Sequence, residues 1–140
     1  MTTQQTYTKP IPMITPENEY YWQKCREREL WMRACPACGP YFYPRDLCPK
    51  CGRRDVEWRQ VSGRGTLYTY AIVHRAPMPG FREDVPFVTA IVELEEGPRM
   101  MTNLVGIEPD PEQIKVGMPV EVEFVEITDE ITLPKFKPRS

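Results

Sequence analysis

Two Cys-x-x-Cys pairs constrain this chain more than any other feature of its sequence. They lie in CPACGPYFYPRDLCPKCG, residues 35–52, and supply Cys35, Cys38, Cys48 and Cys51. Zinc needs four ligands at tetrahedral corners, and a Cys-x-x-Cys turn followed by glycine presents two thiolates from one side. Two such turns separated by nine residues meet on one ion if the insert folds as a hairpin. The spacing therefore predicts a rubredoxin-like zinc ribbon.

Other uses of the cysteines remain open at this point. Two disulfides or a redox pair would fit a secreted chain or a thioredoxin-like βαβ pattern, and the sequence indicates neither. Four thiolates also accept iron. Because a four-thiolate site has no open position for water, we expect one structural zinc ion, with iron as the alternative. The fifth cysteine, Cys25, is expected to be a buried residue rather than a nucleophile.

Composition places the chain among globular proteins with many turns. Its 140 residues include 16 prolines, which favour turns and strand edges over long helices. The net charge of -2 gives no general attraction to polyanions. The N-terminus lacks the pattern of a signal peptide, and no window approaches the roughly 20 apolar residues of a membrane span. We therefore expect a cytoplasmic protein without a membrane segment.

The segment TPENEYYWQKCRERELWMRA predicts a helix over about 16–33, after an extended arm. Thr15 is suited to cap this helix and Pro16 to occupy its first position. Its aromatic residues exceed what one small core normally needs. They either pack on the protein's own ribbon and barrel or anchor a partner. The same two alternatives apply to Tyr41, Phe42 and Tyr43 on the cysteine hairpin.

Five strands are predicted after the cysteine segment, in GRGTLYTYAIVHRA, PFVTAIVELEEG, PRMMTNLVG, VEVEFVEI and ITLPKFKP. Strict alternation in the first would put Leu67, Thr69, Ala71 and Val73 on one face. A short helical turn is expected at Asp110–Pro111. Five strands with one such connection are typical of an OB-fold barrel, although another five-stranded barrel is possible. The prediction is a mainly β chain: arm and helix over 1–33, zinc ribbon over 34–57 and OB-fold barrel over 58–140.

No catalytic motif stands out. The single histidine, His74, lies at the end of a predicted strand, and nothing in the sequence brings it to Cys25 or to a carboxylate. The basic end PKFKPR either neutralises the phosphates of a nucleotide-like ligand or is a soluble tail. From its residues alone, the chain is a metal-stabilised binding module.

The order of helix, ribbon and barrel resembles a prokaryotic family of zinc-ribbon/OB-fold proteins, domain of unknown function thirty-five. The phrases that carry the resemblance are CPACG, CPKCG, GRGTLYTYAIVHRAPMPGF, DVPFV, TNLVG, VGMPVEVEF and LPKFKP. They extend over roughly residues 15–138, and their order is more specific than the cysteines alone.

This resemblance implies a non-catalytic accessory subunit of a thiolase-superfamily enzyme: a thiolase, an acyl-CoA synthase or a retro-aldolase. The subunit would support carbon-carbon bond cleavage or formation in lipid, steroid or aromatic degradation, with acyl-CoA at the shared interface and a hydratase as a further partner. It also implies the four cysteines as metal ligands. The expected partner or acyl-CoA contacts are Tyr20, Tyr21, Trp22, Phe42, His74, Arg75, Phe81, Lys135 and Lys137.

Two other functions compete with this one. A single-stranded nucleic-acid-binding module is the main alternative, but its groove should interleave basic residues with stacking aromatics. Tyr68 and Tyr70 supply rings on a strand without matching charge, so nucleic acid is not the expected partner. A free-standing acyl-CoA enzyme would have to depend on His74.

Overall fold

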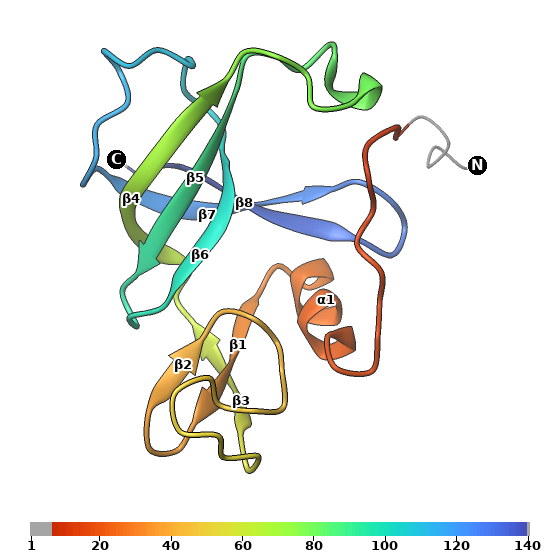
Figure 1. Cartoon of the computed structure of the whole chain (residues 1–140), viewed down its shortest axis with the longest axis vertical. Helices are drawn as coiled ribbons and strands as arrows, with labels where there is room; N and C mark the ends of the chain where they lie inside the picture. The colour runs from red at the N-terminus through yellow and green to blue at the C-terminus, as the bar shows by residue number, and fades with distance from the viewer. Residues whose placement is uncertain (1–6, 140) are drawn as a thin grey trace.

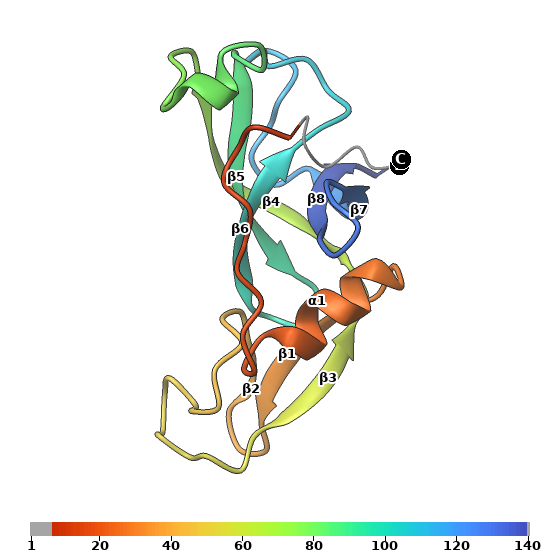
Figure 2. The same cartoon turned by 90° about the vertical axis from the view of Figure 1, so that its right-hand side faces the viewer.

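The computed structural model describes residues 7–139 and has a small sheet at one end and a barrel at the other. The α1 helix lies between the small sheet and the β7–β8 hairpin of the barrel (Figures 1 and 2). The elements are α1 (Glu19–Arg26), β1 (Leu30–Cys35), β2 (Gly39–Tyr41), β3 (Glu57–Val61), β4 (Arg64–Val73), η2 (Pro79–Phe81), β5 (Phe87–Leu94), β6 (Arg99–Leu104), β7 (Pro119–Glu126) and β8 (Thr132–Pro138).

The helix is shorter than the sequence predicts at both ends. It begins at Glu19, and Asn18 rather than Thr15 occupies the N-cap position. It ends at Arg26, and two residues later Arg28 takes a positive φ of 67°, which lets the chain turn sharply into β1. The predicted helix over 16–33 is therefore wrong from residue 27 onward. Local helix propensity gives way there because strand pairing buries Leu30 and Met32.

The small sheet has the strand order β2-β1-β3 and is antiparallel throughout. Leu30 pairs with Val61 and Ala34 with Glu57, so the sheet joins residues on both sides of the cysteine segment. Leu30, Met32 and Val61 share one buried cluster with helix and barrel residues. The helix therefore covers one face of the small sheet and connects its core to that of the barrel.

The barrel is closed, with strand order β4-β5-β6-β8-β7, as expected for an OB fold. In β5 every second residue is buried, Val88, Ala90, Val92 and Leu94, which confirms the predicted alternation. Phe136 of β8 is fully buried at the point where β8 pairs with β6 and β7. Closure places one apolar face inside, although β6 pairs with β8 only at Leu104 and Phe136.

The first barrel strand departs from the alternation that its sequence predicts. A register shift lies between Leu67 and Thr69 in the pairing of β4 with β5. Leu67 is buried, but after the shift Tyr70 and Ile72 pack against the core while Thr69 and Ala71 do not. The extra residue of a β-bulge exchanges the two faces of the strand. The predicted single face was therefore wrong beyond Leu67.

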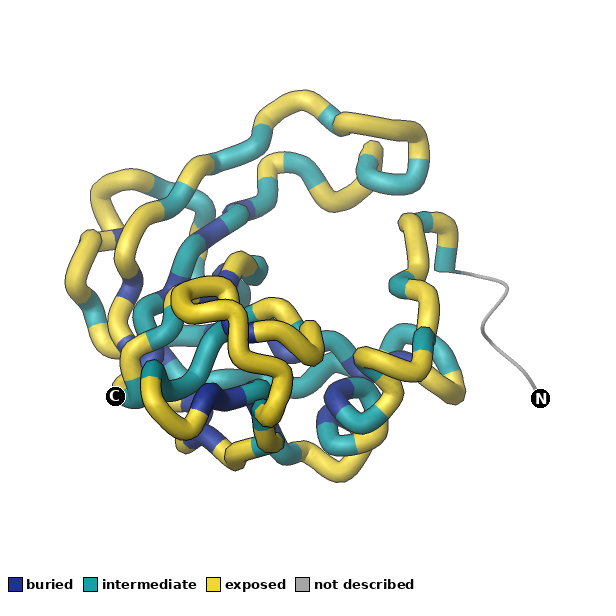
Figure 3. The backbone as a smooth tube through the Cα atoms, turned by 60° about the horizontal axis from the view of Figure 1, so that its bottom comes forward, coloured by how far each residue is buried: buried dark blue, intermediate teal, exposed yellow. Residues whose placement is uncertain are grey.

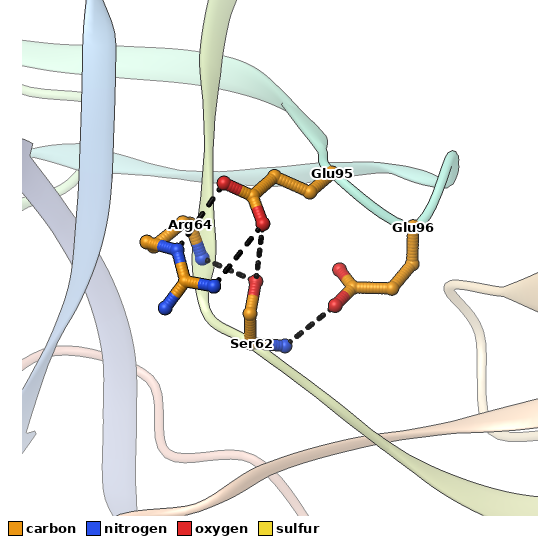
Figure 4. A network of polar contacts seen from close by, with 4 residues as sticks. All are labelled: Ser62, Arg64, Glu95 and Glu96. Atoms are coloured by element: carbon orange, nitrogen blue, oxygen red, sulfur yellow. Dashed lines mark hydrogen bonds and ion pairs between the residues drawn. The ribbon is translucent and has the colours of Figure 1, made fainter.

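A polar network fixes the junction between β3 and β4 (Figure 4). Ser62 donates its backbone N–H to Glu96 Oε2 at 2.8 Å, and the Arg64 guanidinium pairs with Glu95 at 3.2 Å. Gly63 has φ +80°, and a Cβ there would lie 2.6 Å from Val122 Cγ1. The connection between small sheet and barrel is thus short, bonded on both sides and intolerant of a side chain.

The expected helical turn at Asp110 is present as a single hydrogen-bonded turn. The Asp110 carbonyl accepts from Gln113 and Ile114 N–H, while its carboxylate accepts from Glu112 N–H. Ile114 closes one side of the barrel and is buried. In the described part of the chain, no helix has both the length and the apolar character needed to cross a membrane.

Candidate metal centre and binding surfaces

The four cysteines of the two Cys-x-x-Cys pairs converge at the far end of the small sheet. Cys35 ends β1, and all four Sγ atoms lie within 4.8 Å of one another. Each turn uses its glycine as predicted, because Gly39 and Gly52 adopt φ values of +93° and +81°. The hairpin insert therefore does bring the pairs to one point.

The donor set fits a single tetrahedral metal ion. All five cysteines of the chain are free thiols. The Cys35 and Cys51 sulfurs are 3.6 Å apart, close to the roughly 3.8 Å edge of a tetrahedron with sulfur 2.3 Å from zinc. Four sulfur ligands would fill every position of that tetrahedron. The chemistry available to such a centre is structural, since no position is left for water or substrate.

Backbone N–H groups favour the thiolate at Cys48, whereas hydrogen bonds from neighbouring thiols raise the pKa of Cys38 and burial and such bonds raise that of Cys51. Ala37 N–H points at Cys35 Sγ and Lys50 N–H at Cys48 Sγ, both at 3.4 Å. Hydrogen bonds from the Cys51 and Lys50 backbone lower the pKa of Cys48 to about 6. Deprotonated sulfur is the form that binds metal, so these N–H groups favour the ligating state.

Cys25 lies apart from this cluster, in the core between helix and barrel. Its side chain has 0% exposure, and burial raises the pKa of its thiol to about 12. A thiol that stays protonated and has no access to solvent is a poor nucleophile. The structure therefore agrees with the prediction of a buried packing residue.

The three aromatic residues at the start of the helix have different environments. Tyr20 packs against Trp31 and Trp58, with ring centroids 5.7 and 5.0 Å away. Tyr21 is buried in the core, where desolvation raises the pKa of its hydroxyl. Tyr21 and the half-buried Trp22 both line a surface cleft, whereas Tyr20 does not. The aromatic surplus is thus divided between packing within the protein and a surface cleft.

That cleft, named here the aromatic cleft, has a volume of about 310 Å³ and lies where helix, cysteine hairpin and barrel meet. Its lining comes from α1, the hairpin, β6 and β8: Asn18, Tyr21, Trp22, Phe42, Tyr43, Pro44, Met100, Met101, Thr102, Asn103, Leu133, Pro134 and Lys135. The cysteine hairpin therefore builds one wall of a surface shared with the barrel.

Three features of the aromatic cleft are typical of a protein-binding surface. Tyr43 and Met101 at the cleft are 59% and 62% exposed. The Trp22 indole N–H is buried and has no acceptor among the described residues. Exposed aromatic and methionine side chains beside an unpaired donor are common at protein interfaces. Met101 was missed from the sequence, although its outward position beside inward Met100 follows from strand alternation.

A second cavity, named here the arm cavity, brings together two of the other predicted residues. It has a volume of about 750 Å³ and lies between residues 7–10 and the barrel. Phe81 and Lys135 both line it. Exposed His74 and Arg75 lie outside its lining, and Lys137 instead pairs with Glu123 at 3.1 Å. The predicted contacts thus fall on two adjoining cavities that share Lys135, and Tyr20, His74, Arg75 and Lys137 line neither of them.

A four-cysteine ribbon packed on a closed five-stranded barrel defines the class of zinc-ribbon/OB-fold proteins. Residues 22–57 match the family model for the rubredoxin-like zinc ribbon domain of ChsH2, and residues 58–125 match that for its C-terminal OB-fold domain. A DUF35 domain-containing scaffold protein of Methanocaldococcus jannaschii is 40% identical over 78% of this chain and 77% of its own length. The chain therefore belongs to the DUF35 family of ChsH2-type proteins.

Solved structures agree with this assignment. The chain matches a structure described as the Ltp2-ChsH2(DUF35) aldolase with a TM-score of 0.77 and 39% identity, over 91% of this chain and 98% of that one. A DUF35 protein of Sulfolobus solfataricus has the same fold at 15% identity and a TM-score of 0.60, over 89% and 86% of the two chains.

Longer relatives contain the same unit as a part. A probable enoyl-CoA hydratase alpha subunit of Thermomonospora curvata is 40% identical over 93% of this chain. The 3-oxo-4,17-pregnadiene-20-carboxyl-CoA hydratase alpha subunit of Mycobacterium tuberculosis is 44% identical over 84% of it. The chain spans only 40% and 37% of the lengths of these two relatives. Both names describe a subunit of a hydratase.

Proposed function

We propose that this chain is a non-catalytic, zinc-stabilised accessory subunit of a thiolase-superfamily enzyme that cleaves or forms carbon-carbon bonds in an acyl-CoA. The observation that carries the proposal is the aromatic cleft, because it combines exposed Tyr43 and Met101 with the unpaired Trp22 N–H. The match to a ChsH2(DUF35) aldolase structure supports an aldolase-type member of that superfamily as the partner.

In this assembly the chain would organise a surface rather than perform a chemical step. Zinc, held by the four cysteines, would fix the hairpin that carries Phe42 and Tyr43. Phe42 packs against the core and supports the exposed Tyr43 ring, with centroids 4.8 Å apart. The Trp22 ring would line the contact with the partner. Acyl-CoA at the shared interface and association with a hydratase are further parts of the proposal.

Co-expression with an aldolase or thiolase encoded by a neighbouring gene tests this function. The partner is expected to co-purify with the chain, and Tyr43→Ala with Met101→Ala should reduce recovery at least tenfold, since central interface residues carry most binding energy. Tyr68→Ala is the matched control, because Tyr68 is also exposed but lies on the outer barrel face beneath Arg99. Equal losses in both variants, or no complex with the unaltered chain, would contradict the proposal.

A further inference from the structure

The described part of the N-terminal arm is fitted to one loop of the barrel rather than lying loosely on its surface. Residues 7–14 leave the start of the helix and reach the loop that contains η2 (Figures 1 and 2). Thr8 meets Gly80 so closely that a Cβ on Gly80 would lie 2.5 Å from the Thr8 carbonyl oxygen. Gly80 does not have a positive φ. Glycine is therefore needed there to let Thr8 come close, and not to allow a backbone turn.

An ion pair fastens the same contact. Lys9 Nζ lies 2.7 Å from Asp84 Oδ2 and 5.8 Å from the centre of the Phe81 ring. The arm is otherwise mostly exposed along its length, as Figure 3 shows, and none of its residues belongs to a strand. The Thr8 hydroxyl also donates a long hydrogen bond of 3.5 Å to the Gly80 carbonyl. A segment held by so few polar contacts can detach without unfolding the barrel.

The arm cavity lies under this contact and has the character of a small-molecule site. Its 750 Å³ falls in the common range for ligand pockets. Phe81 and Phe87 stack at 5.4 Å on one side, and Val88, Leu104, Val125 and Leu133 add apolar surface. The cavity therefore offers room and apolar contact for an organic molecule.

The charges around the cavity leave one cation without a partner. Lys9 is neutralised by Asp84, and Glu126 by Arg28 at 3.0 Å. The Lys135 ammonium makes no hydrogen bond or ion pair with residues 7–139, although the side chain lines the cavity. Burial, and next the charge of Lys9, lower the pKa of Lys135. An incoming anion would relieve this unfavourable environment.

We propose that the arm cavity binds a small organic anion, with its apolar body against the stacked Phe81 and Phe87 rings and its charge on Lys135, and that residues 7–10 act as a strap across the entrance. The strap is held closed by Lys9–Asp84 and by the approach of Thr8 to Gly80. Carboxylate, sulfonate and phosphate share the chemistry that Lys135 recognises. This site does not depend on a partner enzyme, so it stands or falls separately from the function proposed above.

The zinc-loaded full chain tests the ligand with the fluorescent aryl sulfonate 8-anilinonaphthalene-1-sulfonate. Lys135→Gln should weaken binding about tenfold, as expected for loss of one charge-assisted contact, and Lys135→Arg should retain it. Lys137→Gln is the matched control on the same strand and should bind like the unaltered chain. Octanoate should displace the probe, whereas 1-octanol and inorganic phosphate should not. Unchanged binding in Lys135→Gln, or equal displacement by octanoate and 1-octanol, would overturn the site.

The strap is tested by Gly80→Ala, which blocks the approach of Thr8, and by Asp84→Asn, which removes the ion pair. Both variants should bind the probe several-fold faster and should be cleaved faster by chymotrypsin after Tyr7, as detected by mass spectrometry. Glu83→Gln, in the same loop but away from the cavity lining, is the control. Binding and cleavage rates equal to those of the control would overturn the strap.

Discussion

The barrel and the cysteine hairpin of the small sheet are stabilised in different ways. The barrel closes its hydrogen bonds through five strands and buries Leu67, Val92, Val120 and Phe136 inside. The hairpin over residues 36–57 contributes only Cys48 as a buried residue. A segment that buries so little apolar surface cannot offset its own conformational entropy, so its order depends on the cross-link. The hairpin that lines the aromatic cleft and the barrel that supports it can therefore be stabilised independently of each other.

The largest expected effect is on the stability of the cysteine hairpin. Cys35→Ser or Cys48→Ser should unfold the hairpin, because structural zinc supplies on the order of 10 kcal/mol of binding energy coupled to folding. Metal analysis should give one zinc per chain before the change and far less after it. Hydrogen exchange should show loss of protection in β1–β3 with barrel strands still protected. Cys25→Ser is the control and should retain zinc; equal zinc content in all variants would contradict the metal assignment.

Truncation of a buried side chain tests the stability of the barrel. Phe136→Ala removes a fully buried ring at the closure of the barrel and should lower the free energy of unfolding by about 3–5 kcal/mol. Chemical denaturation with metal present measures the change. The zinc content of the folded fraction should stay at one per chain. If zinc were lost while the barrel remained folded, the two regions would not be held independently.

The junction can be tested separately from either core. Gly63→Ala places a side chain at a positive φ and against Val122. It should lower the free energy of unfolding by about 2–4 kcal/mol. Gly106→Ala is the matched control, because its φ of +74° is similar but a Cβ there meets Lys137 only at 3.5 Å. Gly106→Ala should lower the free energy of unfolding by about 1–2 kcal/mol. Equal unfolding energies for the two variants would show that the close approach of β3–β4 to β7 does not matter.

The smallest effect concerns Cys25, where helix and barrel cores meet. Its folded pKa of about 12 exceeds the ordinary value of 9.0, so its contribution to stability is complete below pH 9 and lost as pH rises toward 12. In the zinc-loaded protein at pH 8, iodoacetamide should leave Cys25 unmodified, and denaturant should expose it. Mass spectrometry distinguishes the sites, and rapid native labelling of Cys25 would show that the cores separate easily.

Local patterns predicted the barrel strands and the cysteine centre well because each depends on short-range geometry. Alternation in β5 and the glycines after each cysteine pair are read directly from neighbouring residues. The helix was overextended because residues 27–33 are good helix formers by local propensity, although Leu30 and Met32, two residues apart, share one face only in a strand. Pairing with β3, distant in sequence, decided in favour of the strand. The bulge at Tyr68 likewise has no clear signal in an apolar strand.

The candidate surfaces were only partly predictable. The sequence provided an aromatic surplus but could not separate Tyr20, which packs internally, from Trp22, which lines the aromatic cleft. Phe81 and Lys135 were expected near a ligand, yet nothing local joined them to each other or to Lys9. Such groupings arise only when the arm, the η2 loop and β8 meet in space.

The sequence by itself determined the metal-binding pattern and the number of barrel strands, because spacing and periodicity are local properties of a chain. Tertiary structure alone decided where the helix ends, which face of β4 turns inward, and which side chains share a cleft. The physical reason is that these outcomes depend on burial and pairing between segments far apart in sequence, whose free energies exceed local propensities of a few tenths of a kcal/mol.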